Sequence, residues 1–319
     1  MQNKVENKKY LSCRDKSEDM SCFACFFPIG FYMEEKSSLA HLAEHCLVSA
    51  LKELTIGNGV RKPFFLEYNG FTTMYYSCIW FRSTSKIYAN TRNIFLESLL
   101  NISANNITED DIAHEKEKIR AELMRLSQDE NVRRTFIHQN LLEEGELNLC
   151  TRSDVLSKIN QYFKSDFIII EYGNREEFDE HTTNDVEHSE VIITDTKIVF
   201  KHSDNVGSVQ LIRFLIYIFR KLGFTAYSKQ YKQNLAMIAL DQPVREVISQ
   251  LPHPNSIQFQ VLLEDFYSKE RVASINTIDY LKNQYKLYIQ TGEICNRIIW
   301  LQSINGIPKR YCRFIKNII

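Results

Sequence analysis

A polar, acidic stretch near the middle of the chain sets the strongest limit on how this sequence can fold. Residues 175–190 read REEFDEHTTNDVEHSE and hold seven Asp or Glu side chains against one Arg. Because almost none of these residues is apolar, we expect an exposed linker over residues 176–190. The chain has 319 residues, which is about twice the usual length of one domain. We therefore predict two modules, over residues 1–175 and 191–319.

Composition places the chain among packed globular proteins. Apolar residues make up 44% and charged residues 25% of the sequence, with only 10 Gly and 6 Pro, which excludes collagen-like and disordered classes. The net charge of −1 provides no overall positive potential for nucleic acid or an anionic membrane. We accordingly expect neither as a partner.

The sequence also carries expectations about compartment. Residues 1–16 lack the apolar core of a secretory signal, so a cytoplasmic location is predicted. The apolar run over 209–219 is interrupted by Arg213 and is too short to span a membrane. Eight cysteines without regular spacing indicate free thiols rather than a disulfide framework.

Apolar periodicity predicts an α+β fold of two linked αβ modules. In the first module we expect strands over 20–27, 71–81 and 167–170, and helices over 39–57 and 88–100. Ser37 or Ser38 provides a cap for the helix over 39–57, and a further helix begins at Thr108 and Asp111 and carries the stripe Ile112, Ile119, Leu123 and Leu126. The second module is predicted as a strand over 197–200, a helix over 209–222, a strand over 227–240 and helices to the C-terminus.

The first strong helix carries the sequence His41-Leu42-Ala43-Glu44-His45. A four-residue step places His41 and His45 on one face of a helix, one turn apart. Glu44 flanks the same face without having to be a ligand. Two imidazoles at this spacing are typical of a metal site, although isolated helix histidines are more often core or surface residues.

A catalytic zinc site needs three protein ligands and an open position for water. The helix that follows Thr108 carries Glu115 and Glu122, which are two helical turns apart and each lie three residues after a stripe position. They therefore edge the buried face, where an unpaired carboxylate is costly. A cation, or a hydrogen bond to a ligating His, accounts for carboxylates at these positions.

With these residues the sequence resembles the pitrilysin/insulinase family of zinc peptidases, which includes the mitochondrial processing peptidase. The His-x-x-Glu-His signature is that of inverzincins. In the family a later helix carries two Glu seven residues apart, the second being the third ligand. Here Glu122 follows Glu115 by 7 residues and His45 by 77 (122 − 45). The resemblance implies Zn²⁺ held by His41, His45 and Glu122, with Glu44 as general base and Glu115 supporting a ligand.

The resemblance extends to the second module. The family places an Arg and a Tyr, seven residues apart, in the half that faces the zinc site, and Arg220 and Tyr227 have this spacing. In two-chain members the pair reaches the partner's zinc site, so the resemblance implies a homodimer or a heterodimer with a related subunit. Taken alone, the two residues are typical of a helix end and a strand surface.

Two features depart from the family pattern. The family's Asn-Ala segment is present only as Asn69-Gly70-Phe71-Thr72 and is shortened. We expect Asn69 and Thr72 to lie at the sheet edge that binds an extended peptide substrate. The second module is shorter than the first, so part of its opening sheet is expected to be missing.

Sequence and resemblance together predict a zinc metalloendopeptidase that cleaves short unfolded peptides. The compact form favours maturation of a small peptide precursor, such as leader removal from a bacteriocin or pheromone. One alternative is a non-catalytic peptide-binding or scaffold subunit of a heteromeric peptidase. A weaker alternative is a thiol redox protein that uses Cys22 and Cys25, but an offset of three in a strand points two sulfurs to opposite faces.

Overall fold

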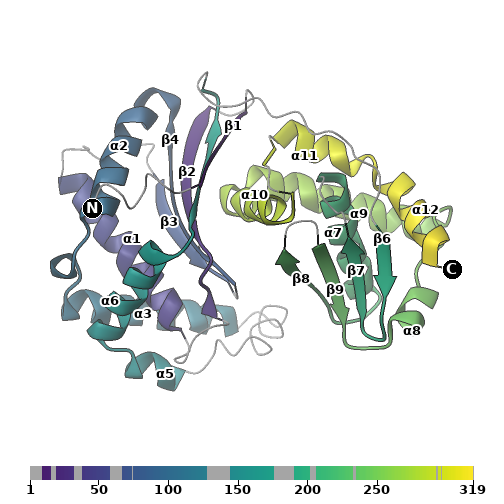
Figure 1. Ribbon diagram of the computed structural model, residues 1–319, viewed down its shortest axis with the longest axis horizontal. Coiled ribbons are helices and arrows are strands. Elements are labelled where there is room, and N and C mark those ends of the chain that lie inside the picture. Colours follow the sequence, from purple (N-terminus) through teal and green to yellow (C-terminus); the bar gives the residue numbers. More distant parts are fainter. Residues whose placement is uncertain are drawn as a thin grey trace. The chain divides into compact units, whose positions relative to one another are not determined.

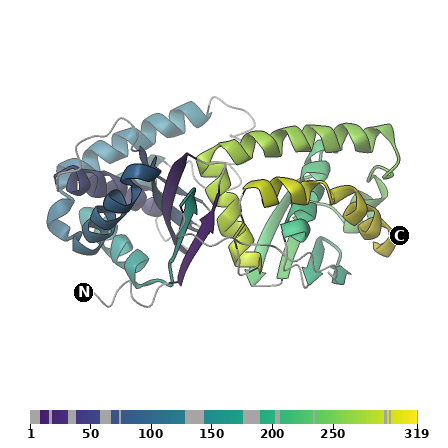
Figure 2. The same ribbon diagram turned by 90° about the horizontal axis from the view of Figure 1, so that it is seen from above.

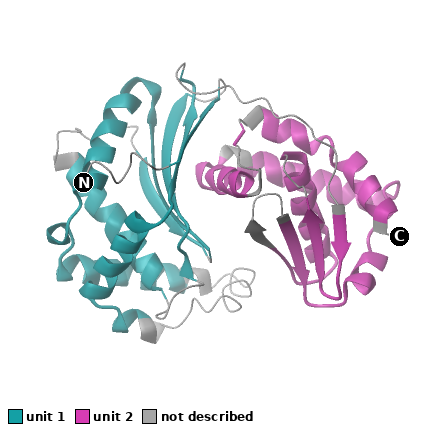
Figure 3. Ribbon diagram, viewed as in Figure 1, with its two compact units in different colours: residues 1–178 teal, residues 179–319 magenta. Residues whose placement is uncertain are grey.

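The chain divides into two compact units, Met1–Phe178 and Asp179–Ile319 (Figure 3). The structure is a computed structural model that describes residues 9–15, 19–31, 38–57, 67–73, 75–127, 144–175, 190–201, 206–232, 235–291, 294–295 and 297–318. The linker expected over 176–190 lies outside the described residues except for Glu190.

Unit 1 is a five-stranded sheet with an accompanying helical layer. The sheet has the order β1-β5-β2-β4-β3, in which β1 pairs with β5 in parallel and the other neighbours are antiparallel. Its strands are β1 (Lys9–Arg14), β2 (Met20–Phe27), β3 (Glu67–Thr72), β4 (Ser77–Thr84) and β5 (Ile168–Gly173). Its helices are α1 (Leu39–Gly57), α2 (Ser85–Asn101), the 3-10 turn η3 (Ala104–Asn106), α3 (Glu109–Ser127), α5 (Glu144–Leu149) and α6 (Arg152–Lys164).

The core of unit 1 lies between this sheet and its helices. Phe23, Cys25 and Phe27 alternate along β2, so their side chains share one face and join a buried cluster with Leu42 and Leu47 of α1. Figures 1 and 2 both show the helices of this unit gathered on one face of its sheet. Strand β3 lies at the opposite edge of the sheet from β1.

Unit 2 also consists of a sheet packed against helices, and its sheet is smaller. Four antiparallel strands have the order β6-β7-β9-β8, and they are β6 (Glu190–Ile193), β7 (Lys197–Lys201), β8 (Ala226–Lys232) and β9 (Leu235–Leu240). The helices are α7 (Val206–Lys221), α8 (Val244–Ser249), α9 (Ile257–Ile275), α10 (Thr277–Thr291), α11 (Arg297–Ile304) and α12 (Ile307–Ile318) (Figure 1). Ile198 and Ile238 of the sheet share one buried cluster with Phe214 of α7 and Phe259 of α9.

Two stretches predicted as single strands are hairpins. The stretch over 71–81 contains the end of β3, a turn in which the Thr73 N–H donates to the Tyr76 carbonyl oxygen (2.8 Å), and most of β4. The stretch over 227–240 contains β8 and β9. Thr and Tyr are strand formers, so composition did not mark the first turn. Strand β1 was not predicted, because its Lys and Arg are typical of an edge strand and resemble a polar tail.

In the part of the chain that the structure describes, no helix combines the length and the apolar character that a membrane crossing requires.

Candidate metal centre

Helix α1 positions His41, Glu44 and His45 because its other face is anchored in the core. Leu42 and Ala43 are fully buried, and the Tyr162 hydroxyl of α6 donates to the Ala40 carbonyl oxygen (2.8 Å). Ser38, one of the two predicted caps, directly precedes α1, and its carbonyl oxygen accepts a hydrogen bond from the Leu42 N–H (2.9 Å). Its φ is 68°, and the other candidate, Ser37, lies outside the described residues.

Helix α3 brings the two predicted carboxylates to the same place. The Thr108 N–H donates to Asp111 Oδ2 (2.7 Å), and the Asp111 N–H donates to Thr108 Oγ1 (3.2 Å), so the predicted cap is present. Ile112 and Ile119 are buried as expected. Their burial turns the edge of the helix that carries Glu115 and Glu122 toward α1.

The three predicted ligands converge. His41 Nε2 and His45 Nε2 are 3.1 Å apart, and each lies 3.6 Å from Glu122 Oε2. In a tetrahedral zinc site with bonds of about 2.0–2.1 Å, ligand atoms lie about 3.3–3.5 Å apart. The described residues therefore place two nitrogens and one oxygen at distances that a single zinc ion can bridge, and this set is the one metal-binding group found among them.

Glu115 holds one of the two imidazoles. Its Oε2 lies 3.2 Å from His45 Nδ1, and its Oε1 accepts a hydrogen bond from Lys118 Nζ (2.6 Å). Glu115 is only 3% exposed, so its charge is balanced within the site. A carboxylate on the far nitrogen fixes the ring orientation of a ligating His and leaves Nε2 available to a metal.

Glu44 lies beside the three ligands, and strand β3 closes over it. Thr72 Oγ1 donates to Glu44 Oε2 (3.3 Å). A Cβ added at Gly70 would overlap Glu44 Oε1. The close approach of β3 to α1 therefore depends on the absence of a side chain at position 70, and Glu44 is 2% exposed as a result.

Burial, hydrogen bonds and nearby charges shift the pKa values at this site. Burial raises the pKa of Glu44 to about 7. Burial, and then the charge of His45, lower the pKa of His41. Burial alone would lower the pKa of His45, but hydrogen bonds to Glu115 and Glu122 outweigh it and raise that pKa. In the metal-free chain a proton on His45 thus supplies the positive charge that surrounding carboxylates favour.

These side chains line one cleft of about 370 Å³ in unit 1, which also includes Asn69 and Thr72 of β3. Among the strands that the structure describes, β3 pairs only with β4 and lies at the edge of the sheet. Asn69 accepts a hydrogen bond from the Gly70 N–H through Oδ1 (2.8 Å) and is exposed. The cleft therefore combines a metal-binding group, a carboxylate and the edge strand of the described sheet.

Arg220 and Tyr227 belong to unit 2. Arg220 lies near the end of α7, and its Nε donates to the carbonyl oxygen of Ala226 (2.8 Å), the residue before Tyr227. Tyr227 lies on the edge strand β8 and is 44% exposed. The two residues are thus neighbours at one corner of unit 2, and their role beside the cleft of unit 1 stays a prediction.

The cysteines form no second site. Cys22 and Cys25 are fully buried in β2, and burial, with Glu171 nearby, raises the pKa of the Cys25 thiol. Of these two residues, Cys25 belongs to the cluster on the helical side of the sheet and Cys22 does not, in keeping with the predicted opposite orientation. Buried, protonated thiols are poor nucleophiles, so the redox alternative loses its support.

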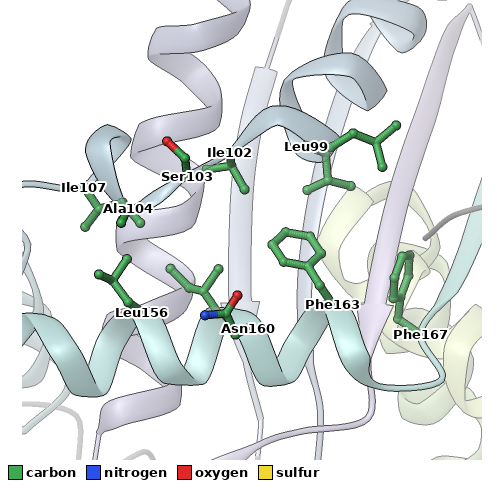
Figure 4. Close-up of a pocket in the computed structure, with 11 residues that line it drawn as sticks. Leu99, Ile102, Ser103, Ala104, Ile107, Leu156, Asn160, Phe163 and Phe167 are labelled. Atoms are coloured by element: carbon green, nitrogen blue, oxygen red, sulfur yellow. The ribbon is translucent and has the colours of Figure 1, made fainter. Parts of the chain in front are cut away.

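A further hollow of about 160 Å³ lies between α2, η3 and α6 (Figure 4). Its walls contain no titratable side chain, so it offers no groups for acid–base or metal chemistry. The walls of this hollow are formed by Leu99, Leu100, Ile102, Ser103, Ala104, Ile107, Leu156, Ile159, Asn160, Phe163 and Phe167.

Sequence reasoning missed two residues of the site. Lys118 follows Glu115 by three residues on α3, and that spacing, typical of a helical ion pair, was the available signal. Gly70 interrupts a strand, which commonly marks a close backbone approach. That signal was present as well.

Comparison with known proteins assigns the fold. No protein-family model matches the sequence, and no curated protein sequence matches it. In structure, the chain is similar to a putative M16-like peptidase from Alicyclobacillus acidocaldarius, with 9% identity and a TM-score of 0.53 over 95% of this chain and 91% of that one. The first half of the periplasmic protease PqqL from Escherichia coli gives 12% identity and a TM-score of 0.53, over 98% and 88%. The chain has the fold of M16-like peptidases.

The fold likeness is not limited to structures described as peptidases. A chain of Complex III2 from Candida albicans, with Inz-5 bound, matches with 9% identity and a TM-score of 0.56 over 97% of this chain and 90% of that one. The expected α+β fold of metallopeptidase type is confirmed by these matches, which extend over nearly the whole chain.

Proposed function

We propose that this protein is a zinc metalloendopeptidase that cleaves short, unfolded peptides. The observation that carries the proposal is the convergence of His41, His45 and Glu122 at distances suited to one zinc ion, beside a buried Glu44. M16-like peptidase structures share the fold.

The residues present fit a zinc ion. Two imidazole nitrogens and one carboxylate oxygen form a common catalytic donor set that leaves a position for water. Glu115 supports His45 on its far nitrogen, as ligating histidines normally require. Zn²⁺ held by these three ligands would supply Lewis acidity that activates water and polarises the scissile carbonyl.

Glu44 is assigned the role of general base. Its carboxylate accepts the proton of the attacking water and delivers it to the leaving amine. Thr72 and the backbone at Gly70 hold the carboxylate in place on the side of β3. Arg220 and Tyr227 are assigned to the developing oxyanion or the neighbouring substrate carbonyl, where loss of one donor commonly costs about 3 kcal/mol.

The substrate is assigned to the edge of β3. An extended peptide that pairs with this edge gains main-chain hydrogen bonds, and its backbone then passes along the cleft that holds Glu44. Main-chain recognition favours unfolded peptides of varied sequence. Maturation of a small peptide precursor by leader removal is our proposal for the biological reaction.

From the family resemblance we propose a homodimer or a heterodimer with a related subunit. A cytoplasmic location is our proposal from the sequence, as argued above. The second candidate function is a non-catalytic peptide-binding or scaffold subunit of a heteromeric peptidase. A chain of Complex III2, whose description names no peptidase, shares the fold.

The deciding experiment measures zinc and cleavage together. Purified chain loaded with zinc is expected to retain one equivalent after dialysis, and to cleave members of a library of short unstructured peptides. Glu44→Gln should retain the zinc but lose at least about 1000-fold in kcat, since general base and charge are both removed. Glu53→Gln, an exposed position on the same helix, is the matched control and should behave as wild type.

The outcomes separate the candidates. The peptidase is supported if His41→Ala or Glu122→Ala loses the zinc and Glu44→Gln loses cleavage. Zinc and peptide binding without cleavage, for every peptide in the library, favours the non-catalytic subunit. Wild-type cleavage by Glu44→Gln would contradict the general-base assignment.

A further inference from the structure

We propose that Ser77 and Tyr162 are positioning residues that hold the Glu44 carboxylate through the hydroxyl of Thr72. Glu44 is the general base in the proposed function, and the roles of Ser77 and Tyr162 rest on that proposal. Together with Thr72 they form a row of three hydroxyl groups, from β3, β4 and α6, that ends on the carboxylate. Neither Ser77 nor Tyr162 lines the cleft, so both act through other residues.

The hairpin of β3 and β4 places the first two hydroxyls together. Thr72 and Ser77 are directly opposite each other in this antiparallel pair, so their side chains extend from the same face of the sheet. Thr72 Oγ1 and Ser77 Oγ lie 3.1 Å apart. Thr72 Oγ1 also lies 3.3 Å from Glu44 Oε2. A cross-strand pair therefore carries a hydrogen-bonded connection from β4 to the carboxylate on α1.

Tyr162 of α6 continues the row behind Ser77. Its hydroxyl oxygen lies 3.1 Å from Ser77 Oγ and 2.8 Å from the Ala40 carbonyl oxygen. Its ring stacks on that of Phe27 in β2, with the ring centroids 5.0 Å apart. Tyr162 and Ser77 are both fully buried. Packing therefore fixes this end of the row, as precise placement of a functional group requires of the residues behind it.

The number of protons gives the row a direction. Each hydroxyl has one proton to donate and lone pairs that accept, whereas an ionised carboxylate only accepts. An ionised Glu44 thus takes the Thr72 proton. Thr72 Oγ1 can then accept from Ser77, and Ser77 Oγ can accept from Tyr162. Because hydrogen bonds to a charged acceptor are the stronger ones and donors aligned in a chain polarise one another, the charge of Glu44 orders the whole row.

Two backbone carbonyls keep the row satisfied at the stage of the reaction when Glu44 carries the proton taken from water. Ser77 Oγ lies 2.9 Å from the Ile29 carbonyl oxygen, and the Tyr162 hydroxyl has the Ala40 carbonyl oxygen within reach. Both hydroxyl protons can turn to these oxygens, so neither is left without an acceptor. The row thus serves the charged and the neutral form of the general base while its heavy atoms stay in place.

Steady-state kinetics of the zinc-loaded chain measure the contribution of the row. Ser77→Ala and Tyr162→Phe each remove one hydroxyl and keep the rest of the side chain. We expect kcat to fall at least about tenfold in each, since a misplacement of about 1 Å at a catalytic group commonly costs about 100-fold. KM should stay within about twofold of the wild-type value, because neither residue lines the cleft. The zinc content should be unchanged.

Matched controls remove a buried hydroxyl elsewhere. Ser83 lies on the same strand as Ser77 and is fully buried, and its Oγ donates to the Thr84 carbonyl oxygen (3.4 Å). Tyr311 is buried in unit 2, where its hydroxyl donates to the Pro252 carbonyl oxygen (2.8 Å). Ser83→Ala and Tyr311→Phe should both retain the wild-type kcat. Thermal melting verifies that each variant is folded.

A double substitution separates positioning of the base from general damage to the fold. In the Glu44→Gln background no base is left to position, so adding Ser77→Ala should change the residual kcat by less than about twofold. The same loss in this background as in the wild-type background would show that Ser77 acts independently of Glu44, and would overturn the proposal. A wild-type kcat in folded Ser77→Ala and Tyr162→Phe chains would overturn it too.

Crystal structures of zinc-free chains test the positioning without any assay of cleavage. In the wild type and in Ser83→Ala, the Glu44 carboxylate should have one conformation, with the Thr72 hydroxyl beside Oε2. In Ser77→Ala both groups should be displaced or occupy more than one conformation. A wild type that cleaves no peptide would refute the proposed function alone, because these structures still decide the positioning. An identical Glu44 conformation in all three chains would overturn the positioning roles.

Discussion

Among the residues of the site, Glu115 has the environment that most directly indicates a metal-binding role. A carboxylate that is 3% exposed and lies between an imidazole and a lysine is costly unless it orients something. Burial opposes its ionised form, yet the hydrogen bonds to His45 and Lys118 lower its pKa to about 2. It therefore presents a permanent negative charge to His45 Nδ1.

We expect Glu115→Gln to weaken zinc affinity by about 10–100-fold, because the ligating ring loses a charged partner. Competition with a chromophoric zinc chelator measures the change. Glu117→Gln lies two residues away on the same helix with its side chain 71% exposed, and should bind zinc as wild type does. Equal affinities in the two variants would show that Glu115 does not support the metal.

Gly70 controls a different property, the position of the general base. In Gly70→Ala the new methyl group overlaps Glu44 Oε1, so either β3 or the carboxylate must move. A displacement of about 1 Å at a catalytic group commonly costs about 100-fold in rate. We therefore expect kcat to fall by about that factor while zinc content is unchanged. Unaltered kcat would mean that the close approach of β3 has no catalytic role.

At this scale the sequence predicts what lies on one helix and misses what depends on packing. His41, Glu44 and His45 follow from helical spacing, and Glu115 and Glu122 follow from their place beside a buried stripe. Lys118 pairs with Glu115 on the same helix, so its spacing was an available local signal. Gly70 acts through its close approach to Glu44, which depends on how β3 packs against α1, and no local pattern encodes that packing.

Among the elements, α3 shows how a local signal supports a distant site. Thr108 and Asp111 cap the helix reciprocally, and the helix then carries Glu115 and Glu122 to α1. Thr108→Ala should lower the free energy of unfolding of unit 1 by about 1 kcal/mol. Thr108→Ser retains the hydroxyl and should lose far less.

Fluorescence separates the two units in that measurement. The chain has 2 Trp, Trp80 on β4 and Trp300 on α11, so a Trp300→Phe background reports on unit 1 alone. Urea unfolding followed through Trp80 gives the stability of each variant. A Thr108→Ala midpoint equal to that of Thr108→Ser would contradict the capping contribution.

Elements with strong periodicity were predictable, and those defined by pairing were not. Strand β2 has the predicted bounds, and α1 begins and ends where the apolar pattern does. Both hairpins were read as continuous strands. In the first, Thr and Tyr, which favour strands, continue from β3 into β4. The edge strand β1 escaped notice because its pairing with β5, rather than its own composition, makes it a strand.

For the molecule as a whole, the acidic stretch over 175–190 led to the expectation of two modules, and the chain divides into two units nearby, after Phe178. The sequence does not encode which chain completes the active site. Glu44 lies in unit 1 and Arg220 in unit 2. A substitution at either residue therefore disables one half of the proposed machinery and leaves the other half intact.

Mixing Glu44→Gln and Arg220→Ala chains tests whether units from different chains cooperate. If sites form between chains of a symmetric dimer, half of the dimers in an equimolar mixture are mixed, and each has one intact site. About one quarter of wild-type activity should then return. If each chain completes its own site, or if no dimer forms, the mixture stays as inactive as its components.

A matched mixture excludes a trivial recovery. The control mixture combines Glu44→Gln chains with His41→Ala chains. Both substitutions alter unit 1, so no dimer of these chains contains an intact unit 1. Each mixed dimer still has a damaged metal site or a missing base at both centres. Recovery in this control would therefore reveal contaminating peptidase, whereas recovery confined to the Glu44→Gln and Arg220→Ala pair requires that Arg220 of one chain serves the metal centre of another.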